Sequence, residues 1–365
     1  MSFKKVVVGM SGGVDSSVAA WLLKQQGYDV IGVTMQIWQE ETSEIVEENG
    51  GCCGLSAVED ARRVAARIGI PYYVMNFRDV FKEKVIDNFV SEYEKGRTPN
   101  PCIMCNRYVK WEALLDKAVA LGADYIATGH YAKVICLDNG RYAVEKAAFD
   151  RKDQTYALYN LNQYQLAHTL MPVGDYDKED VRRIAAEIGL SVANKPDSQD
   201  ICFVPDGNYQ SFMEEYTGRR LPDGNFVDKN GNILGHHKGI GAYTIGQRKG
   251  LNLSMGHPVF VTSIDPEHNE VIIGENEELF HRSLYASHLN LMSLASLKEP
   301  KRLTAKIRYA HKAAACTARQ LSDGRLYVSF DEPQRAITPG QAVVLYDGQI
   351  VAGGGIIEGV APDDL

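Results

Sequence analysis

A run of glycine, serine and aspartate directly after an apolar segment is the strongest chemical signal in the sequence. Residues 4–10 (KKVVVGM) are apolar and β-branched, residues 11–17 read SGGVDSS, and an amphipathic stretch follows over 15–26. Such a passage from strand to helix brings glycine backbone, serine hydroxyls and the N–H groups of a helix N-terminus to a phosphate. No Walker A lysine follows, so the loop suits a leaving pyrophosphate better than a transferred γ-phosphoryl group. Asp15 is predicted to hold Mg²⁺ there; the alternative is a glycine-rich turn with ordinary caps.

Three cysteines are placed where sulfur chemistry can occur. Cys102 and Cys105 form a Cys-x-x-Cys in residues 100–106 (NPCIMCN), which we expect in a loop, and Cys202 lies in residues 197–203 (DSQDICF). A thiolate can carry sulfur as a persulfide, and a second thiol can release that sulfur by forming a disulfide. The alternatives are a zinc knuckle, which needs four ligands, or inert thiols.

The other cysteines carry weaker signals. Cys52 and Cys53 are adjacent, so they cannot easily share one role, and we expect no catalytic function for them. Cys136 and Cys316 lie in apolar, strand-like segments and are expected in the core.

Composition places the chain among globular proteins and limits its partners. It has 365 residues, 45% of them hydrophobic, 24% charged, and a net charge of −8. This length predicts two or three domains, and the acidic balance means that an RNA partner needs a local basic patch. The sequence shows no signal-peptide h-region and no apolar run of about 20 residues, so a cytoplasmic location is expected.

The elements that must position these residues alternate between strand and helix over the first 200 residues. This alternation predicts an α/β fold with a doubly wound parallel sheet, whose ligands bind beyond the carboxyl ends of the strands. The expected strands are 4–10, 29–36, 72–77 and 125–130, and the expected helices are 15–26, 56–68 (with Ser56 as N-cap), 80–93 and 109–121.

Turn signals become dense after about residue 205, and short β-like runs dominate from about residue 285. We therefore expect three domains: a nucleotide-binding catalytic domain over 1–205, a small mixed domain over 206–282, and a C-terminal β-barrel-like domain over 283–365.

Several strings in a fixed order resemble one family across essentially the whole chain. SGGVDSS is similar to the signature of PP-loop ATPases, and the set as a whole resembles the tRNA-specific 2-thiouridylases (tRNA uridine 2-sulfurtransferases, the MnmA/TrmU family). The strings are SGGVDSS (11–17), NPCIMCN (100–106), TGHYA (128–132), RKDQTYALY (151–159), PDSQDICF (196–203), GIGAYTIGQRKGL (239–251) and KIRYAH (306–311).

The resemblance implies ATP-dependent 2-thiolation of the wobble uridine (position 34) of tRNA. It implies that ATP is split into AMP and pyrophosphate with Mg²⁺, that the uridine is adenylated, and that the cysteines deliver the sulfur. The implied partners are tRNA and a sulfur-donor protein, such as a cysteine desulfurase or a sulfur relay protein.

The resemblance also implies roles for individual residues. Cys105 takes the role of the family's nucleophile and Cys202 that of the persulfide carrier, and the two form a disulfide at the end of the cycle. Asn100, Pro101 and Cys102 match the segment beside the target base. The implied ATP site comprises Gly9, Met10, Ser11, Gly12, Gly13, Val14, Asp15, Ser16, Met35 and Gly129, and the implied tRNA contacts are His130, Lys152, Asp153, Gln154, Arg308, Tyr309 and Gln341.

The segment 300–320 supports an RNA contact independently of the resemblance. It contains six basic residues and no acidic one, with Tyr309 and His311 among them. Basic and aromatic side chains together suit phosphate contact and base stacking. The alternative is a solvated, charged strand face.

One departure from the family leaves the sulfur chemistry open. Many relatives carry aspartate where this chain has Cys102, so Cys102, Cys105 and Cys202 could together hold a [4Fe–4S] cluster that binds sulfide. Two other functions also remain: another PP-loop ligase, such as a tRNA lysidine synthetase, and a nucleotide- and RNA-binding module without turnover.

Overall fold

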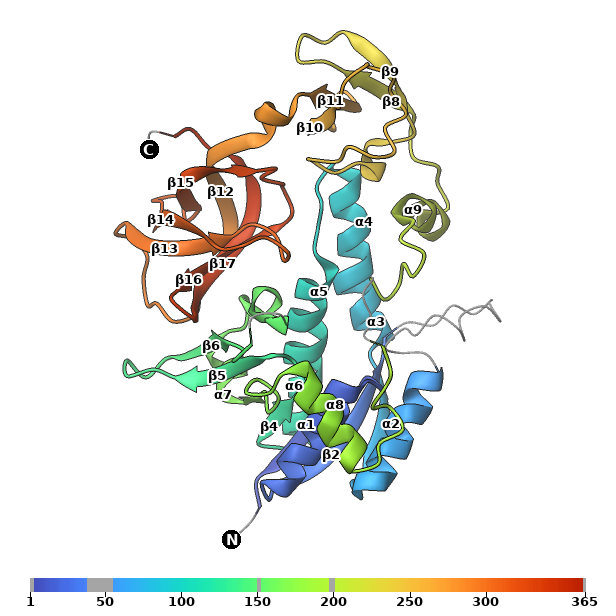
Figure 1. Cartoon of the computed structure of the whole chain (residues 1–365), viewed down its shortest axis with the longest axis vertical. Coiled ribbons are helices and arrows are strands. Elements are labelled where there is room, and N and C mark those ends of the chain that lie inside the picture. Colours follow the sequence, from blue (N-terminus) through green and yellow to red (C-terminus); the bar gives the residue numbers. More distant parts are fainter. Residues whose placement is uncertain (1–2, 38–54, 150–151, 197–200, 364–365) are drawn as a thin grey trace. The chain divides into compact units, whose positions relative to one another are not determined.

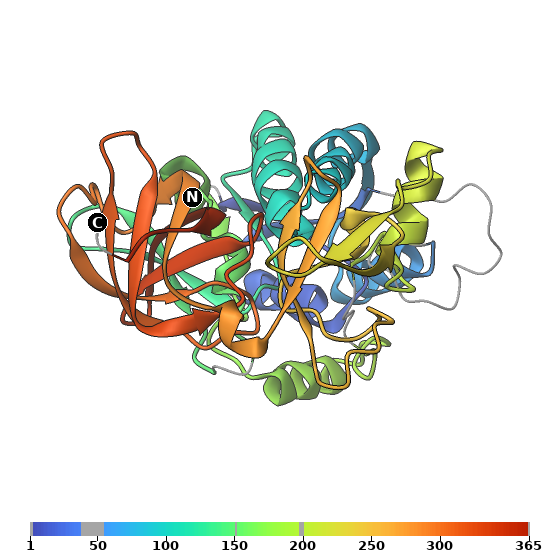
Figure 2. The same cartoon turned by 90° about the horizontal axis from the view of Figure 1, so that it is seen from above.

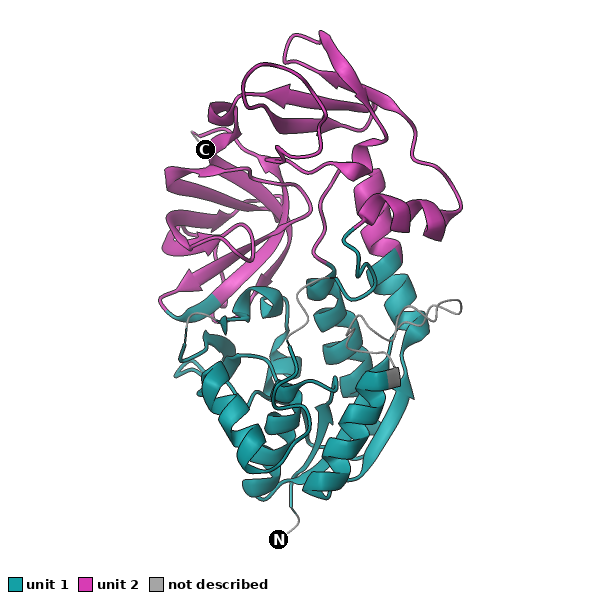
Figure 3. Cartoon of the chain, turned by 45° about the vertical axis from the view of Figure 1, so that its right-hand side comes forward, with its two compact units in different colours: residues 1–86, 101–207, 349–351 teal, residues 87–100, 208–348, 352–365 magenta. Residues whose placement is uncertain are grey.

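The computed structural model describes residues 3–37, 55–149, 152–196 and 201–363. The chain forms two compact units that alternate along the sequence (Figure 3). Unit 1 comprises 1–86, 101–207 and 349–351, and unit 2 comprises 87–100, 208–348 and 352–365.

A five-stranded parallel sheet is the centre of unit 1. Its strand order is β3-β2-β1-β4-β7, and the side chains of Val6, Val7 and Val8 in β1 are fully buried. Helices cover such a sheet on both faces, which is why its central strand is a continuous apolar run. The strands are β1 (Lys5–Gly9), β2 (Asp29–Gln36), β3 (Tyr72–Asn76), β4 (Tyr125–Ala127) and β7 (Thr169–Leu170).

The strand order reverses at β1. The chain passes from β1 to β2 on one side, and β4 lies on the other side of β1. A parallel sheet binds ligands outside the carboxyl ends of its strands at such a reversal. The loop after β1 therefore lies where the sequence predicted a ligand.

Helices and one hairpin complete unit 1 (Figure 1). The hairpin pairs β5 (Ala132–Cys136) with β6 (Tyr142–Lys146). The helices are α1 (Val14–Gln25), α2 (Leu55–Ile68), α3 (Arg78–Phe81), η2 (Lys82–Ile86), α5 (Pro101–Met104), η3 (Cys105–Leu114), α6 (Leu115–Ala120), η5 (Thr155–Leu158), α7 (Gln163–Ala167) and α8 (Lys178–Glu187).

Two local expectations were wrong. The Cys-x-x-Cys is helical rather than in a loop, because α5 begins at Pro101 and continues into η3 at Cys105. Proline suits a first helical position, since its φ is already helical and its missing N–H would have no helical partner there. Ser56 lies inside the first turn of α2, which begins at Leu55, so it is not the N-cap.

Unit 2 contains a small sheet and a barrel (Figure 2). The small sheet has the order β10-β11-β8-β9 and mixes one parallel with two antiparallel pairings. Its elements and the helices of this unit are α4 (Asp87–Glu94), α9 (Tyr209–Thr217), β8 (Gly224–Val227), β9 (Ile233–His237), η6 (Ile240–Ala242), β10 (Phe260–Asp265) and β11 (Glu270–Gly274).

An antiparallel barrel follows, closed by the pairing of β12 with β17. Its interior is an apolar cluster that includes Leu284, Phe330 and Leu345. The barrel elements are η7 (Asn276–Leu279), β12 (Phe280–Leu291), β13 (Lys301–Lys306), β14 (Ala314–Gln320), β15 (Leu326–Arg335), β16 (Ala342–Asp347) and β17 (Ile350–Val360). The expected fold class, a parallel-sheet domain followed by a small mixed sheet and a β-barrel, is confirmed.

No helix within the described ranges has the length and apolar character needed to cross a membrane.

Candidate active site

The loop after β1 is held in shape by its own serines and by a close approach to α2. Gly12 has φ +69°, and a Cβ there would lie 2.4 Å from the carbonyl oxygen of Ala57. The N–H of Ser11 donates to Ser16 Oγ over 3.2 Å, and Ser17 Oγ donates to the carbonyl of Gly13 over 2.7 Å. Only glycine fits the position of Gly12, because that φ and the lack of space both exclude a side chain. Ser17 is fully buried, so its hydroxyl stabilises the loop from inside.

The other predicted ATP-site residues gather around this loop. A Cβ built on Gly129 would lie 2.5 Å from the N atom of Ser16, so the loop after β4 touches the first turn of α1. A Cβ on Gly9 would lie 3.7 Å from Cε of Met35, at the end of β2. The ends of three neighbouring strands thus bring Gly9, Met35 and Gly129 to one edge of the sheet.

Met10 and Val14 have buried side chains, so they present only backbone to a ligand.

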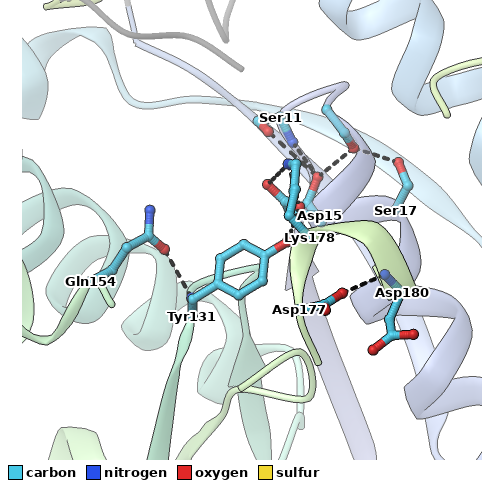
Figure 4. Close-up of polar contacts among 10 residues, drawn as sticks. Ser11, Asp15, Ser17, Tyr131, Gln154, Asp177, Lys178 and Asp180 are labelled. Carbon is cyan, nitrogen blue, oxygen red and sulfur yellow. Dashed lines mark hydrogen bonds and ion pairs between the residues drawn. The ribbon is translucent and has the colours of Figure 1, made fainter. Parts of the chain in front are cut away.

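Asp15 is the centre of a polar cluster that the sequence did not predict (Figure 4). Its carboxylate accepts hydrogen bonds from Tyr131 Oη at 2.6 Å and from Lys178 Nζ at 2.7 and 2.8 Å. Gln154 fixes Tyr131, because its Oε1 accepts from the Tyr131 N–H at 2.9 Å. No sequence signal linked Lys178 to this loop, since 163 residues separate it from Asp15.

A second polar chain joins the Cys-x-x-Cys helix to the loop after β4. Lys110 Nζ donates to Asn106 Oδ1 over 2.9 Å and lies 3.5 Å from His130 Nε2. His130 Nδ1 in turn lies 2.7 Å from Thr128 Oγ1. Asn106 itself is buried and donates to the carbonyl of Ala157 over 2.9 Å. Asn106, the residue after Cys105, is therefore fixed by hydrogen bonds on both sides of its amide group.

His130 is neutral under ordinary conditions. Desolvation, and secondly the charge of Lys110, hold the pKa of its imidazole well below the usual range. Its ring also packs against Trp111, with 5.4 Å between centroids. The sequence predicted a tRNA contact for His130, and that remains a prediction; within unit 1 its two ring nitrogens face Lys110 and Thr128.

The three predicted sulfur-handling cysteines all belong to unit 1. Cys102 is exposed in α5, while Cys105 at the start of η3 and Cys202 are partly buried. Phe203, next to Cys202, packs edge-on against Phe81 at 5.7 Å. The helix α3, which ends at Phe81, also contacts η3. The segments that carry Cys105 and Cys202 are thus in indirect contact, through α3.

The expectations for the remaining cysteines had different outcomes. Cys316 is buried, and burial raises the pKa of its thiol to about 12, so its place in the core is confirmed. Cys136 is exposed, so its expected burial was wrong. It ends the edge strand of a hairpin, where one face of the strand lies open to solvent. Cys52 and Cys53 lie outside the described residues.

A metal-ligand set is not found in the described part of the chain. No group of three or more histidine, cysteine, aspartate or glutamate side chains gathers there in a way that could hold a metal ion. Cys102, Cys105 and Cys202 are all described, and they do not form such a group. The geometry therefore gives no support to the iron–sulfur interpretation.

Two of the predicted tRNA contacts in unit 1 also have structural roles. Asp153 accepts from the N–H and the hydroxyl of Thr155, the first residue of η5, at 3.3 and 2.9 Å. Gln154 holds Tyr131, as described above, while Lys152 is exposed.

In unit 2, the side chains of two residues that were predicted to contact tRNA donate hydrogen bonds to other residues of the same unit. Arg308 donates to the carbonyls of Ile245 and Ala336 and to the hydroxyl of Thr338. Gln341 Nε2 donates to the carbonyl of Thr98 over 2.9 Å. Tyr309 is 46% exposed, and Lys306 Nζ lies 5.7 Å from the centre of its ring. Of this set, the side chain of Tyr309 is the one most open to a partner.

The basic segment 300–320 is partly neutralised by acidic residues from elsewhere in the barrel. Lys301 pairs with Asp347 at 3.0 Å, and Arg302 pairs with Asp331 through both guanidinium nitrogens at 2.6 and 2.7 Å. The segment itself contains no acidic residue, so its sequence did not indicate these ion pairs. The two acidic partners lie on β15 and β16.

Comparison with known proteins assigns the family. The profile described as tRNA methyl transferase HUP domain matches residues 4–206, the tRNA methyl transferase PRC-barrel domain matches 210–275, and the aminomethyltransferase beta-barrel domain matches 281–357. A tRNA-specific 2-thiouridylase MnmA of Lachnoclostridium phytofermentans is 64% identical over 354 residues, which are 97% of this chain and 99% of the relative. The chain belongs to the tRNA-specific 2-thiouridylase family.

Other 2-thiouridylases match over a similar length. The tRNA-specific 2-thiouridylase MnmA of Clostridioides difficile strain 630 is 58% identical over 356 residues, which are 97% of this chain and 98% of the relative. Among solved structures, a 4-thiouridine synthetase–RNA complex with bound ATP aligns with 59% of this chain and 50% of its own, at 21% identity and a TM-score of 0.37. The identity to the two 2-thiouridylases confirms the resemblance that the motifs indicated.

Proposed function

We propose that this protein is an ATP-dependent tRNA sulfurtransferase that converts the wobble uridine (position 34) of tRNA to 2-thiouridine. The observation that carries the proposal is that one unit holds both a phosphate loop at the strand-order reversal and the helix that starts with the Cys-x-x-Cys. Relatives at 64% and 58% identity that carry the 2-thiouridylase name support the same reaction.

The loop of residues 9–16 would bind the phosphates of ATP through backbone N–H groups at the start of α1. The carboxylate of Asp15 is a suitable Mg²⁺ ligand, since it is partly exposed beside this loop. When bound, Mg²⁺ neutralises charge on the departing pyrophosphate. The uridine 2-oxygen attacks the α-phosphate, so AMP becomes the leaving group at C2.

We assign sulfur delivery to Cys202 and Cys105. The terminal sulfur of a persulfide on Cys202 bonds to C2 of the uridine, and AMP leaves. The Cys105 thiolate then attacks Sγ of Cys202, which breaks the sulfur–sulfur bond, forms a Cys105–Cys202 disulfide and leaves sulfur on C2. A thiol reductant and a sulfur-donor protein restore both residues.

The predicted contacts complete the proposal. Asn100, Pro101 and Cys102 would lie beside the target base, which must leave the stack to react. Unit 2 would contact tRNA through Tyr309. The boundaries between the three proposed domains lie near residues 205 and 282. The soluble partners are tRNA and a sulfur donor, and the location is cytoplasmic.

Nucleoside mass spectrometry tests this function. Unmodified tRNA is incubated with the protein, ATP, Mg²⁺ and either a persulfide-loaded desulfurase or sulfide. We expect ATP-dependent 2-thiouridine from the persulfide donor, and none from Cys105→Ser or Cys202→Ser, because each removes one sulfur of the relay.

Cys136→Ser is the matched control, because Cys136 is an exposed cysteine of the same unit. It should retain full thiolation. Pyrophosphate release without thiouridine in the wild type would instead indicate a different PP-loop product, such as that of a lysidine synthetase. Thiouridine from the Cys105→Ser and Cys202→Ser variants would exclude the relay.

A further inference from the structure

A lysine from far along the chain lies at the phosphate loop. Lys178 Nζ is 2.7 and 2.8 Å from the two carboxylate oxygens of Asp15, and Figure 4 shows it reaching Asp15 from the start of α8. Walker-type loops carry their phosphate-binding lysine within the loop itself. Residues 9–17 contain no lysine, so the fold places one beside the loop from another element.

The ammonium group of Lys178 is held in position by its contacts within the fold. The side chains of Lys178 and Asp15 are 13% and 28% exposed. The Asp177 carboxylate caps α8 by accepting from the Asp180 N–H at 2.6 Å, and α8 packs against α1. Ordering this long side chain in the folded protein lowers the entropy cost of using it in binding.

The negative charge of the Asp15 carboxylate gives the Lys178 cation a role at this loop. The carboxylate of Asp15 lies in the first turn of α1, so without Mg²⁺ it would repel a pyrophosphate group bound at the same loop. Lys178 offsets that repulsion. An ammonium group has three donors, so it can hold the carboxylate and contact a phosphate oxygen together.

We propose that Lys178 is the phosphate-binding lysine of this site: it positions Asp15 and contacts the pyrophosphate end of ATP. The inference rests on the proposed function, in which this loop binds ATP. It assigns the role of the missing loop lysine to a residue of α8.

Calorimetric binding of two separate ligands, pyrophosphate and AMP, tests this assignment. We expect Lys178→Met to weaken pyrophosphate binding by roughly tenfold to hundredfold, as for loss of a hydrogen bond to a charged group, and to change AMP binding less than about twofold. Lys178→Arg should restore most of the affinity for pyrophosphate. Equal losses for both ligands would show a purely structural role and overturn the proposal, as would no loss for either.

Lys133→Met is the matched control. Lys133 also forms a partly buried ion pair in unit 1, with Glu145 at 2.6 Å, but it lies on the β5–β6 hairpin. This variant should bind pyrophosphate like the wild type.

A double variant tests the charge argument directly. In EDTA, Asp15→Asn in the Lys178→Met background should recover part of the pyrophosphate affinity, because the repelling carboxylate is gone. No recovery would overturn the charge argument. These measurements need no turnover, so a wild type that binds pyrophosphate through Lys178 but makes no thiouridine would refute the proposed function alone.

Discussion

At the scale of single residues, the surroundings of a side chain decide its charge and its availability. His130 and Arg308 were both predicted to contact tRNA, yet both engage polar atoms inside the fold. A sequence string identifies the residue type, and only the contacts show which of its atoms are already engaged.

His130 should make unfolding depend on pH. Its folded pKa is depressed, whereas in the unfolded chain it is about 6.5. Above that pH both states are neutral and stability is full. As the pH falls below it, the unfolded state gains a proton that the folded state excludes, so the free energy of unfolding drops by up to about 1.4 kcal/mol per pH unit. Urea unfolding at several pH values, followed by tryptophan fluorescence, should show that the free energy of unfolding falls less steeply with acid in His130→Asn.

His268 provides a control with the opposite sign. It is exposed, and its hydrogen bond to Asp265 raises its pKa. It therefore adds stability at low pH that is lost as the pH rises through its folded pKa, and His268→Asn should steepen the acid loss. A slope for His130→Asn that equals the wild type would contradict the neutral, shielded imidazole.

At the scale of elements, caps and close approaches determine where the functional groups lie. The helix α8 begins with Lys178 directly after its N-cap Asp177. The helix α1 begins directly after the glycines, with Gly129 against its first turn. A change at either helix start should therefore move the cluster around Asp15.

Asp177→Ala should affect both stability and ligand binding. Loss of an N-cap side chain costs about 1 kcal/mol of unfolding free energy. Because the first turn of α8 carries Lys178, we also expect pyrophosphate affinity to fall about threefold to fivefold through a cost of similar size. Thermal unfolding and calorimetry measure the two effects.

Asn208→Ala is the comparison for that experiment. Asn208 caps α9 in unit 2 by accepting from the Ser211 N–H at 3.1 Å. It should lose similar stability without losing pyrophosphate affinity. Equal affinity losses in both variants would show that the cap acts only through general stability.

At the scale of the whole molecule, an acidic protein must bind the phosphates of an RNA with a small number of lysine and arginine side chains. The net charge is −8, and two basic residues of the segment 300–320 are paired with Asp331 and Asp347. Fewer cations of this segment are therefore open to a phosphate than its composition suggests.

The salt dependence of tRNA binding should distinguish paired from exposed cations. Lys312 is exposed, so Lys312→Ala should reduce the slope of log Kobs against log salt by about 1. Lys301→Ala should change it less, because Lys301 is held by Asp347 at 3.0 Å. Filter binding across a salt series measures both slopes. Equal slopes for the two variants would contradict the importance of this pairing.

The amino-acid sequence alone predicts the fold class, the phosphate loop and the family. These depend on local order: an apolar strand, glycines and a helix start follow one another within residues 5–25, and the cysteine strings keep their own spacing. Tertiary packing assembles the rest of the site, because Lys178, Tyr131 and Lys110 come from separate elements. It also decided that the Cys-x-x-Cys is helical, that Cys136 is exposed and that Arg302 is paired. Burial and long-range ion pairing depend on which elements pack together, and local patterns do not encode that packing.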